Sequence, residues 1–451
     1  MIKRVFDEQY QRLRSAILSK KSDSGDVLRG AITSFLIMFF GFIVGYSSQV
    51  FLARLSGQSE FGLYAYAWTW ASALSMFLAL GLNQAIMRIV PTYTAKGQYA
   101  HIKGLLILTP VLVFFCAVVA CTIIAFIVAP IASKFAPEYV RPLNITFAIC
   151  PFLAIITLFQ GTGRALGAVV VTYAPRSIGI PLFVVLAAGL WISFGNTLDS
   201  TDILLFSLAA CILFALVQAI LLHKNLPDDI VKASPSYDVR SWLRISLPLL
   251  FASGMQLILN YADILMIGYY LNPSEIAIFH AATRTAILIS GFLVAVNALA
   301  APKIARFHAD GKLSELQDFI SEIIHWIFWP SLLATVIAIL FGETILSAFG
   351  EEYTTGYQVL SILAIAQLIN AGSGPVGYLM TMTGHHDVSA YVFGFSAVLN
   401  IILNAILIPL LGIMGAAIAT ATTMVLWNLT FIVLAQKRLN IRSYIFAKVQ
   451  K

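Results

Sequence analysis

The sequence predicts an all-α integral membrane protein with about twelve transmembrane helices, arranged as two parallel-repeat six-helix bundles around a central cavity. Three observations lead to this prediction. Apolar segments of about 20 residues, the length that spans a bilayer, recur along the whole chain. Only 11% of the 451 residues are charged, far below the share of about 25% that is usual in soluble domains. In addition, the second half of the chain repeats a pattern of the first half.

The predicted spans follow the apolar segments in chain order. They cover residues 27–53, 61–90, 104–129, 140–161, 168–193, 202–223, 241–270, 277–301, 319–341, 355–382, 388–409 and 412–435. With the N-terminus in the cytoplasm, most lysines and arginines of the connecting loops fall on the cytoplasmic side, as the positive-inside rule requires. We therefore expect both termini to be cytoplasmic.

The two terminal segments outside the spans are basic. Residues 1–26 form a cytoplasmic N-terminal segment that fits an interfacial amphipathic helix or, equally well, a solvated tail, and residues 436–451 form a cytoplasmic basic tail. No apolar core with a cleavage site follows the positive start directly, so a signal peptide is not predicted. The net charge of +7 follows membrane topology, and we expect no nucleic-acid partner.

Residues 224–240, with two prolines and mixed charges, predict a cytoplasmic linker between residues 27–223 and residues 241–435. These halves share two sequence anchors, at offsets of 215 and 214 residues. The anchors are Ser59, Glu60 and Tyr64 with Ser274, Glu275 and Phe279, and Ile131, Ser133, Phe135, Glu138 and Tyr139 with Ile345, Ser347, Phe349, Glu352 and Tyr353. Because each half has an even number of spans, the two repeats should run in the same direction through the membrane.

The most polar pair of spans flanks a turn at residues 272–275. Before the turn, Gln256, Asn260 and Asp263 fall at i, i+4 and i+7 on one helical face, and Arg284 follows the turn. Asp263 and Arg284 are both predicted to lie inside the bilayer, where an ionisable group indicates function, with a partner or a wet cavity beside it. The alternative is a salt bridge between the two residues that joins their helices.

Other polar groups in the spans have two interpretations each. Arg88, Arg164 and Arg29 lie near the predicted cytoplasmic ends of their spans, where guanidinium groups fit an anionic headgroup, or simply obey the positive-inside rule. Asn400 and Asn404, at i and i+4, favour interhelical hydrogen bonds. In the first span, Gly41, Gly45 and Ser48 align with Gln256, Asn260 and Asp263, which predicts either a cavity with small residues on one side and polar ones on the other, or close helix packing at the two glycines.

Several classes of protein are disfavoured. The pair Gly311-Lys312 is followed by Leu313, so it is not a P-loop, and ATP-driven transport is not predicted. Every predicted outer loop is too short for an enzymatic sugar-nucleotide site, and His385, His386 and Asp387 are adjacent residues in a turn, which favours a solvated turn over a metal site. The four cysteines fall within spans and predict neither disulfides nor metal ligands. We expect a protein that is not an enzyme and has no metal or cofactor.

Several motifs resemble a known family. The stretch from Phe51 to Tyr64 (FLARLSGQSEFGLY) and the stretch from Gly81 to Arg88 (GLNQAIMR) are similar to the opening hairpin of polysaccharide transporters, the O-antigen and exopolysaccharide flippases. The later half agrees with the same family at residues 349–353 (FGEEY), 400–404 (NIILN), 408–409 (IP) and 411–417 (LGIMGAA). This family is part of the multidrug, oligosaccharidyl-lipid and polysaccharide exporter superfamily.

The resemblance implies a flippase of the bacterial cytoplasmic (inner) membrane. Such a protein moves an undecaprenyl-pyrophosphate-linked oligosaccharide across the membrane by alternating access, driven by an H⁺ or Na⁺ gradient, and has polysaccharide polymerase or assembly proteins as partners. The relatives kept as alternatives are lipid II-type flippases, which typically carry two further helices, and multidrug cation antiporters, which often use acids in the N-terminal bundle, where the first span here has none.

On this interpretation, the candidate residues have two roles. Candidate contacts to the substrate's phosphates or acidic sugars are Arg284, Arg88, Arg164, Arg29, Gln256 and Asn260. Asp263 is the candidate for ion coupling, since a proton or Na⁺ there would change the local charge and favour one state of the transporter over another.

Overall fold

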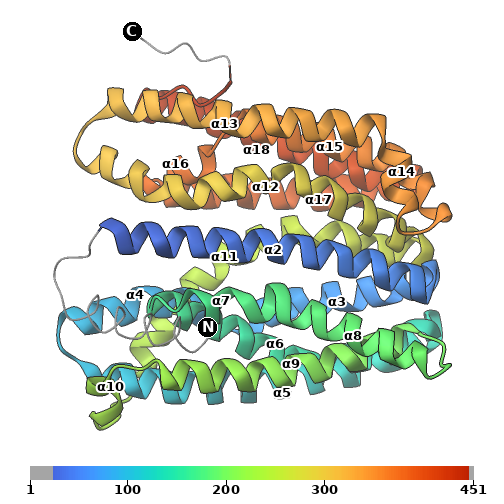
Figure 1. Ribbon diagram of the computed structural model, residues 1–451, viewed down its shortest axis with the longest axis horizontal. Coiled ribbons are helices and arrows are strands. Elements are labelled where there is room, and N and C mark those ends of the chain that lie inside the picture. The colour runs from blue at the N-terminus through green and yellow to red at the C-terminus, as the bar shows by residue number, and fades with distance from the viewer. Residues whose placement is uncertain (1–23, 446–451) are drawn as a thin grey trace. The chain divides into compact units, whose positions relative to one another are not determined.

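The computed structural model describes residues 24–445, so the predicted N-terminal amphipathic segment and the end of the basic tail lie largely outside the described residues. Within this range the secondary structure is helical (Figure 1). Ten helices are long and apolar enough to cross a membrane, or up to twelve if two bent helix pairs each count as one span. The prediction of an all-α membrane protein with about twelve spans is therefore confirmed.

The described residues form two compact units, one from residues 24–48 and Ala67–Gly254, the other from Gln49–Tyr66 and residues 255–445. We call them unit 1 and unit 2. The helices α2, α3 and α11 each contribute residues to both units, because the chain passes from one unit to the other inside these helices. The bundle limits predicted from the repeat, 27–223 and 241–435, differ from this division by contacts and stay a prediction.

Unit 1 is built around α6, the most buried of its long helices, which packs against α4, α5 and α9. The helices with residues in unit 1 are α2 (Ser24–Ser56), α3 (Gln58–Leu78), α4 (Leu82–Ala95), α5 (Tyr99–Phe135), α6 (Val140–Ala165), α7 (Val169–Ala174), α8 (Ile180–Ser193), α9 (Ser200–Lys224), α10 (Asp228–Lys232) and α11 (Val239–Tyr270). The short helix α10 lies in the predicted linker, and Lys103 of α5 donates a hydrogen bond to the Val231 carbonyl at 2.6 Å.

A π-helical turn, Pro175–Gly179, joins α7 to α8. Pro175 has no N–H to donate to the Val171 carbonyl four residues earlier. The buried side chain of Gln218 on α9 donates to that carbonyl instead, at 2.8 Å. On the other side of the turn, a Cβ added to Gly41 of α2 would lie 2.6 Å from the Cβ of Ser177. Close packing, one of the two interpretations of Gly41 and Gly45, is therefore confirmed for Gly41, whereas a Cβ added to Gly45 would meet no atom within 4 Å.

Unit 2 is built around α12 and α15, and Figure 1 shows α12, α13, α15 and α18 running side by side. Besides its parts of α2, α3 and α11, it contains α12 (Pro273–Ala309), α13 (Leu313–Leu340), α14 (Gly342–Ser347), the 3₁₀ helix η3 (Glu351–Gly356), α15 (Tyr357–Gly372), α16 (Val376–Met382), α17 (His386–Leu411) and α18 (Ile413–Leu439). The two bent spans are α11, by 41°, and the segment from η3 to α16, by 43°. His385, His386 and Asp387 lie at the start of α17.

The predicted turn between the most polar spans is a capped helix start. Asn272 Oδ1 accepts a hydrogen bond from the Glu275 N–H at 3.1 Å, the Glu275 carboxylate accepts from the Asn272 N–H, and Pro273 occupies the first turn of α12. The backbone of α3 approaches this start so closely that a Cβ added to Gly62 would overlap the Pro273 carbonyl. Only glycine fits there.

The repeat is visible in local structure. The Glu-Tyr pair of the second anchor lies in a short 3₁₀ helix in each half, η1 (Pro137–Tyr139) and η3. Tyr139 is 6% exposed in unit 1, and Tyr353 is fully buried in unit 2. Similar sequences thus fold into similar elements about 214 residues apart, as the repeat predicts.

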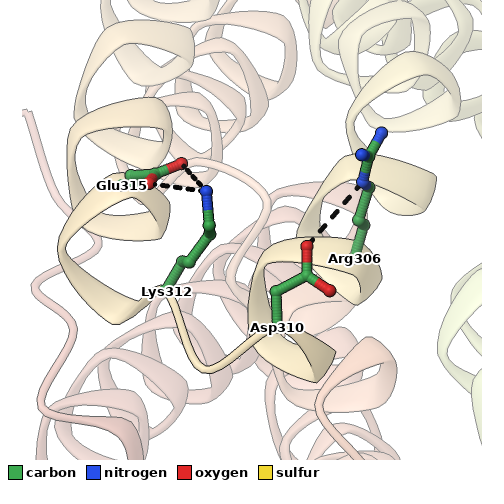
Figure 2. Close-up of polar contacts among 4 residues, drawn as sticks. All are labelled: Arg306, Asp310, Lys312 and Glu315. Carbon is green, nitrogen blue, oxygen red and sulfur yellow. Dashed lines mark hydrogen bonds and ion pairs between the residues drawn. The ribbon is translucent and has the colours of Figure 1, made fainter.

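The turn between α12 and α13 carries two surface ion pairs (Figure 2). Arg306 lies 3.8 Å from Asp310, and Lys312 lies 2.9 Å from Glu315. All four side chains are largely exposed, so each pair contributes between about 0 and 1 kcal/mol. These charges mark a solvated end of the helices rather than a site.

Candidate functional site

The buried carboxylate of Asp263 is the centre of a polar network in unit 2. Asp263 lies on α11 and is 8% exposed. Its Oδ1 accepts a hydrogen bond from Asn404 Nδ2 of α17 at 2.7 Å, and its Oδ2 accepts one from the Thr420 hydroxyl of α18. Hydrogen bonds to a charged acceptor are stronger than neutral ones, so this carboxylate ties three helices together.

The network extends to a second row of side chains. Asn404 Nδ2 also lies 3.1 Å from Asn400 Oδ1, and Asn400 Nδ2 lies 3.5 Å from the Thr423 hydroxyl on α18. The prediction that Asn400 and Asn404 form interhelical hydrogen bonds is therefore confirmed. Asn404 Oδ1 is buried and has no hydrogen-bond partner among the described residues. A buried carbonyl oxygen without a partner can accept a hydrogen bond from a proton donor or bind a cation.

Only one member of the polar face of α11 is buried. Gln256 and Asn260 are exposed, and Asn260 Nδ2 donates to the Gln256 carbonyl at 2.8 Å. Asp263 is buried because α17 and α18 supply side chains at its level. The i, i+4, i+7 spacing correctly predicts that the three residues share one face of α11. That face is exposed at Gln256 and Asn260 and covered by α17 and α18 at Asp263.

Arg284 lies on α12 in a second polar cluster of unit 2. Its Nε donates to Nε2 of His280, one turn earlier, at 3.3 Å. His280 is 1% exposed, and the same Nε2 lies 3.2 Å from Oε1 of Gln49 on α2. Tyr64 and Tyr261 are close enough to Arg284 to interact with it electrostatically.

Arg284 and Asp263 do not form the salt bridge that the sequence allowed. Asp263 is bonded to Asn404 and Thr420, and the ion pairs found within residues 24–445 are those of the α12–α13 turn. Arg284 is thus a half-buried cation inside a predicted span, whose hydrogen-bonded side-chain partner is an imidazole.

The arginines predicted at the cytoplasmic side belong to unit 1. Arg88 on α4 is exposed, and Arg164 at the end of α6 is half-buried, with its Nε 3.3 Å from the Gln160 carbonyl. Arg29 lies in α2, and its side chain is outside what the structure describes. A further arginine, Arg176 of the π-helical turn, donates to the Thr157 hydroxyl at 3.1 Å. The roles of Arg88, Arg164 and Arg29 stay predictions.

Sequence reasoning missed His280, Gln49 and Thr420. The signal for His280 was its position four residues before Arg284 in an apolar span, the spacing of neighbours on one helix face. Thr420 lies three residues before Thr423, which also places the two hydroxyls on one face. For Gln49 the sequence held no comparable signal, since its partner lies on α12, more than two hundred residues later.

The sequence is similar to known protein families and to known proteins. The model of a family described as polysaccharide biosynthesis protein matches residues 27–308, and the MatE family model matches residues 248–406. A curated relative is the probable low-salt glycan biosynthesis flippase Agl15 of Haloferax volcanii. It is 24% identical over 407 residues, which cover 88% of this chain and 80% of the relative.

Solved structures share the fold at low sequence identity. An inward-facing multidrug resistance MATE family transporter of the MOP superfamily matches with a TM-score of 0.70 and 13% identity, over 91% of this chain and 98% of that one. The lipid II flippase MurJ in an inward closed conformation matches with a TM-score of 0.67 and 14% identity, over 90% of this chain and 87% of that one. The matched family model covers well over half of the sequence, and the chain therefore belongs to the polysaccharide biosynthesis protein family.

Proposed function

We propose that this protein is a flippase that moves an undecaprenyl-pyrophosphate-linked oligosaccharide unit across the cytoplasmic membrane by alternating access, for the synthesis of a surface polysaccharide. Family membership and the name of the Haloferax relative support transport in glycan synthesis. The observation that carries the choice of an anionic substrate is Arg284, a half-buried cation in a span with no carboxylate partner among the described residues.

In the described part of the chain, Arg284 has no charged partner to offset the cost of placing it in a membrane span. Placing an arginine at the centre of a membrane helix costs on the order of 2.5 to 3.5 kcal/mol on insertion scales. Membrane proteins usually offset this cost by pairing the charge or by letting it face a wet cavity or a pathway. His280 accepts one hydrogen bond but brings no negative charge while it does so. A pyrophosphate or an acidic sugar would supply the missing charge and match the guanidinium fork.

The test is genetic and chemical. The gene is deleted in its host, and undecaprenyl-linked lipids are extracted from inner-membrane vesicles. A saccharide-bearing intermediate should accumulate on the cytoplasmic leaflet. The wild-type gene should relieve the accumulation, Arg284→Ala should not, and the matched control Arg306→Ala should, because Arg306 is a largely exposed arginine of the same helix. Equal relief by both arginine variants would remove Arg284 from the transport path.

The same extracts separate the alternatives. Accumulation of a peptidoglycan precursor would identify a lipid II-type flippase. Absence of any intermediate, together with altered sensitivity to cationic drugs, would identify a multidrug cation antiporter. The second result would conflict with the electrostatics of unit 2, because an unpaired arginine repels a cationic drug.

Asp263 is the proposed site of ion coupling. Its carboxylate, the buried Asn404 Oδ1 and the Thr420 hydroxyl are oxygen atoms of the kind that bind a proton or Na⁺. Neutralising the carboxylate would weaken its bonds to α17 and α18 and shift the balance between transporter states. Transport into vesicles should lose its dependence on an H⁺ or Na⁺ gradient in Asp263→Asn. Retained, gradient-dependent transport in this variant would refute the coupling role.

The remaining predictions concern context. We propose that both termini are cytoplasmic, that membrane lipids surround the helices, and that polysaccharide polymerase or assembly proteins act with the flippase. Transport by conformational exchange needs no catalytic residue, so the proposed function is not enzymatic.

A further inference from the structure

We propose that His280 is a positioning residue that holds the guanidinium of Arg284 in the orientation needed to bind the substrate anion. This inference rests on the proposed function, since it assigns a role to a second residue of the same cluster. It starts from one contact, the 3.3 Å hydrogen bond from Arg284 Nε to His280 Nε2.

The direction of that hydrogen bond fixes the state of the ring. Arginine has donors only, so Nε2 of His280 must accept and carries no proton. The imidazole is therefore neutral, with its proton on Nδ1. Gln49 lies 3.2 Å from the same Nε2. Its Oε1 faces this nitrogen, whose single lone pair accepts from Arg284 Nε, so Gln49 provides no second donor to the ring.

The ring is also fixed by packing. His280 is 1% exposed and meets the edge of Phe61 of α3, with ring centroids 5.8 Å apart and an interplanar angle of 75°. Its Nδ1 is buried without a hydrogen-bond partner among the described residues. A buried donor without a partner costs free energy. The fold keeps this imidazole in place although a purely apolar side chain would avoid that cost.

As a consequence, the guanidinium of Arg284 is held at its Nε and, among the described residues, not at its two terminal nitrogens. Nε is engaged by His280, and no hydrogen bond of Nη1 or Nη2 is found in the described part of the chain. Those two nitrogens carry four of the five N–H groups of the side chain and form the fork that binds two phosphate oxygens at once. Because His280 already restricts the Arg284 side chain, binding of the anion costs less side-chain entropy.

The experiment measures binding of farnesyl pyrophosphate, a short soluble polyprenyl pyrophosphate, to the full-length protein in nanodiscs by calorimetry. His280→Phe keeps an aromatic ring against Phe61 but removes the acceptor, and His280→Gln keeps an acceptor. Loss of a hydrogen bond to a charged group should raise the dissociation constant of His280→Phe about tenfold or more. His280→Gln should stay within about threefold of wild type, since it restores that bond.

Two further measurements separate positioning from a merely structural role. In the double variant His280→Phe/Arg284→Ala, affinity should equal that of Arg284→Ala alone, because His280 acts only through Arg284. Thermal unfolding of every variant shows whether it is folded, and His280→Leu replaces His280→Phe if the latter is not. The control Asn428→Leu removes a buried polar group elsewhere in unit 2 and should leave affinity unchanged.

The outcomes are distinguishable. Weak binding by His280→Phe, rescue by His280→Gln and non-additivity with Arg284→Ala support the proposal. If Arg284→Ala weakens binding but His280→Phe does not, the role of His280 is refuted and the proposed function stands. If Arg284→Ala binds the probe as wild type does, both the Arg284 contact and the His280 proposal are refuted.

Discussion

The hydrogen bond between Asn404 and Asp263 offers a quantitative test of the buried network. The donor–acceptor distance is 2.7 Å, and the acceptor is a carboxylate that is 8% exposed. A hydrogen bond to a charged group contributes about 1.5 to 3 kcal/mol. Asn404→Leu keeps a side chain of similar size but leaves the carboxylate with one hydrogen bond fewer. We expect this variant to lose at least about 1.5 kcal/mol of unfolding free energy at neutral pH.

A double-mutant cycle isolates the pair. The variants are Asp263→Leu, Asn404→Leu and the double variant, each unfolded by SDS in mixed micelles and followed by circular dichroism. Removing both partners leaves neither group orphaned, so the double variant should be more stable than the sum of the single losses predicts. The expected coupling energy is about 1.5 to 3 kcal/mol.

A neutral pair in the same unit is the matched control. Asn428 Nδ2 of α18 donates to Asn370 Oδ1 of α15 at 3.1 Å, without a charge on either side. Coupling energies of neutral pairs between membrane helices average about 0.6 kcal/mol. A coupling energy for Asp263 and Asn404 that is no larger than that of this control would refute the claim that a charged, buried bond holds α11 to α17.

Two further predictions concern helix packing and a side-chain hydrogen bond. Gly62→Ala should lower the unfolding free energy by about 1 to 3 kcal/mol, because the added Cβ would overlap the Pro273 carbonyl. In the control Gly45→Ala the added Cβ meets no atom within 4 Å, so this variant should be neutral or slightly stabilising. Equal midpoints of the two variants in SDS unfolding would contradict this prediction. Gln218→Leu should cost about 1 kcal/mol, because it leaves the Val171 carbonyl without its side-chain donor. An unfolding free energy equal to that of wild type would show that this carbonyl finds another partner.

The sequence predicted correctly those features whose cause lies within a few residues of the chain. The spans follow from runs of apolar residues, because a membrane helix must satisfy its own backbone and present apolar side chains to lipid. The helix start at Asn272 follows from its side chain and that of Glu275, which bond to backbone groups three residues away. Even the repeat anchors recur as similar short helices, since similar local sequences have similar local preferences.

The candidate site was predicted less completely. Arg284 and Asp263 stand out in the sequence as charges in apolar spans, and the structure places both in polar clusters of unit 2. The mutual salt bridge, which was the alternative interpretation of these two charges, is absent among the described residues, where Asn404 and Thr420 bond to Asp263 instead. Arg284 is the oppositely charged residue that lies near Asp263 in the sequence. The donors that lie closest to Asp263 in space are on α17 and α18, which are distant from it in the sequence.

By itself, then, the sequence determined the membrane class, the number and order of spans, the turn before α12 and the charges that lie in apolar surroundings. Each of these depends on composition or on neighbours within a few residues. Only the tertiary structure decided which part of the polar face of α11 is buried, and which partners Asp263 and Arg284 have. Those partners lie on α17, α18 and α2 or one turn away on α12. Hydrogen bonds between helices depend on packing, which brings together residues more than a hundred positions apart.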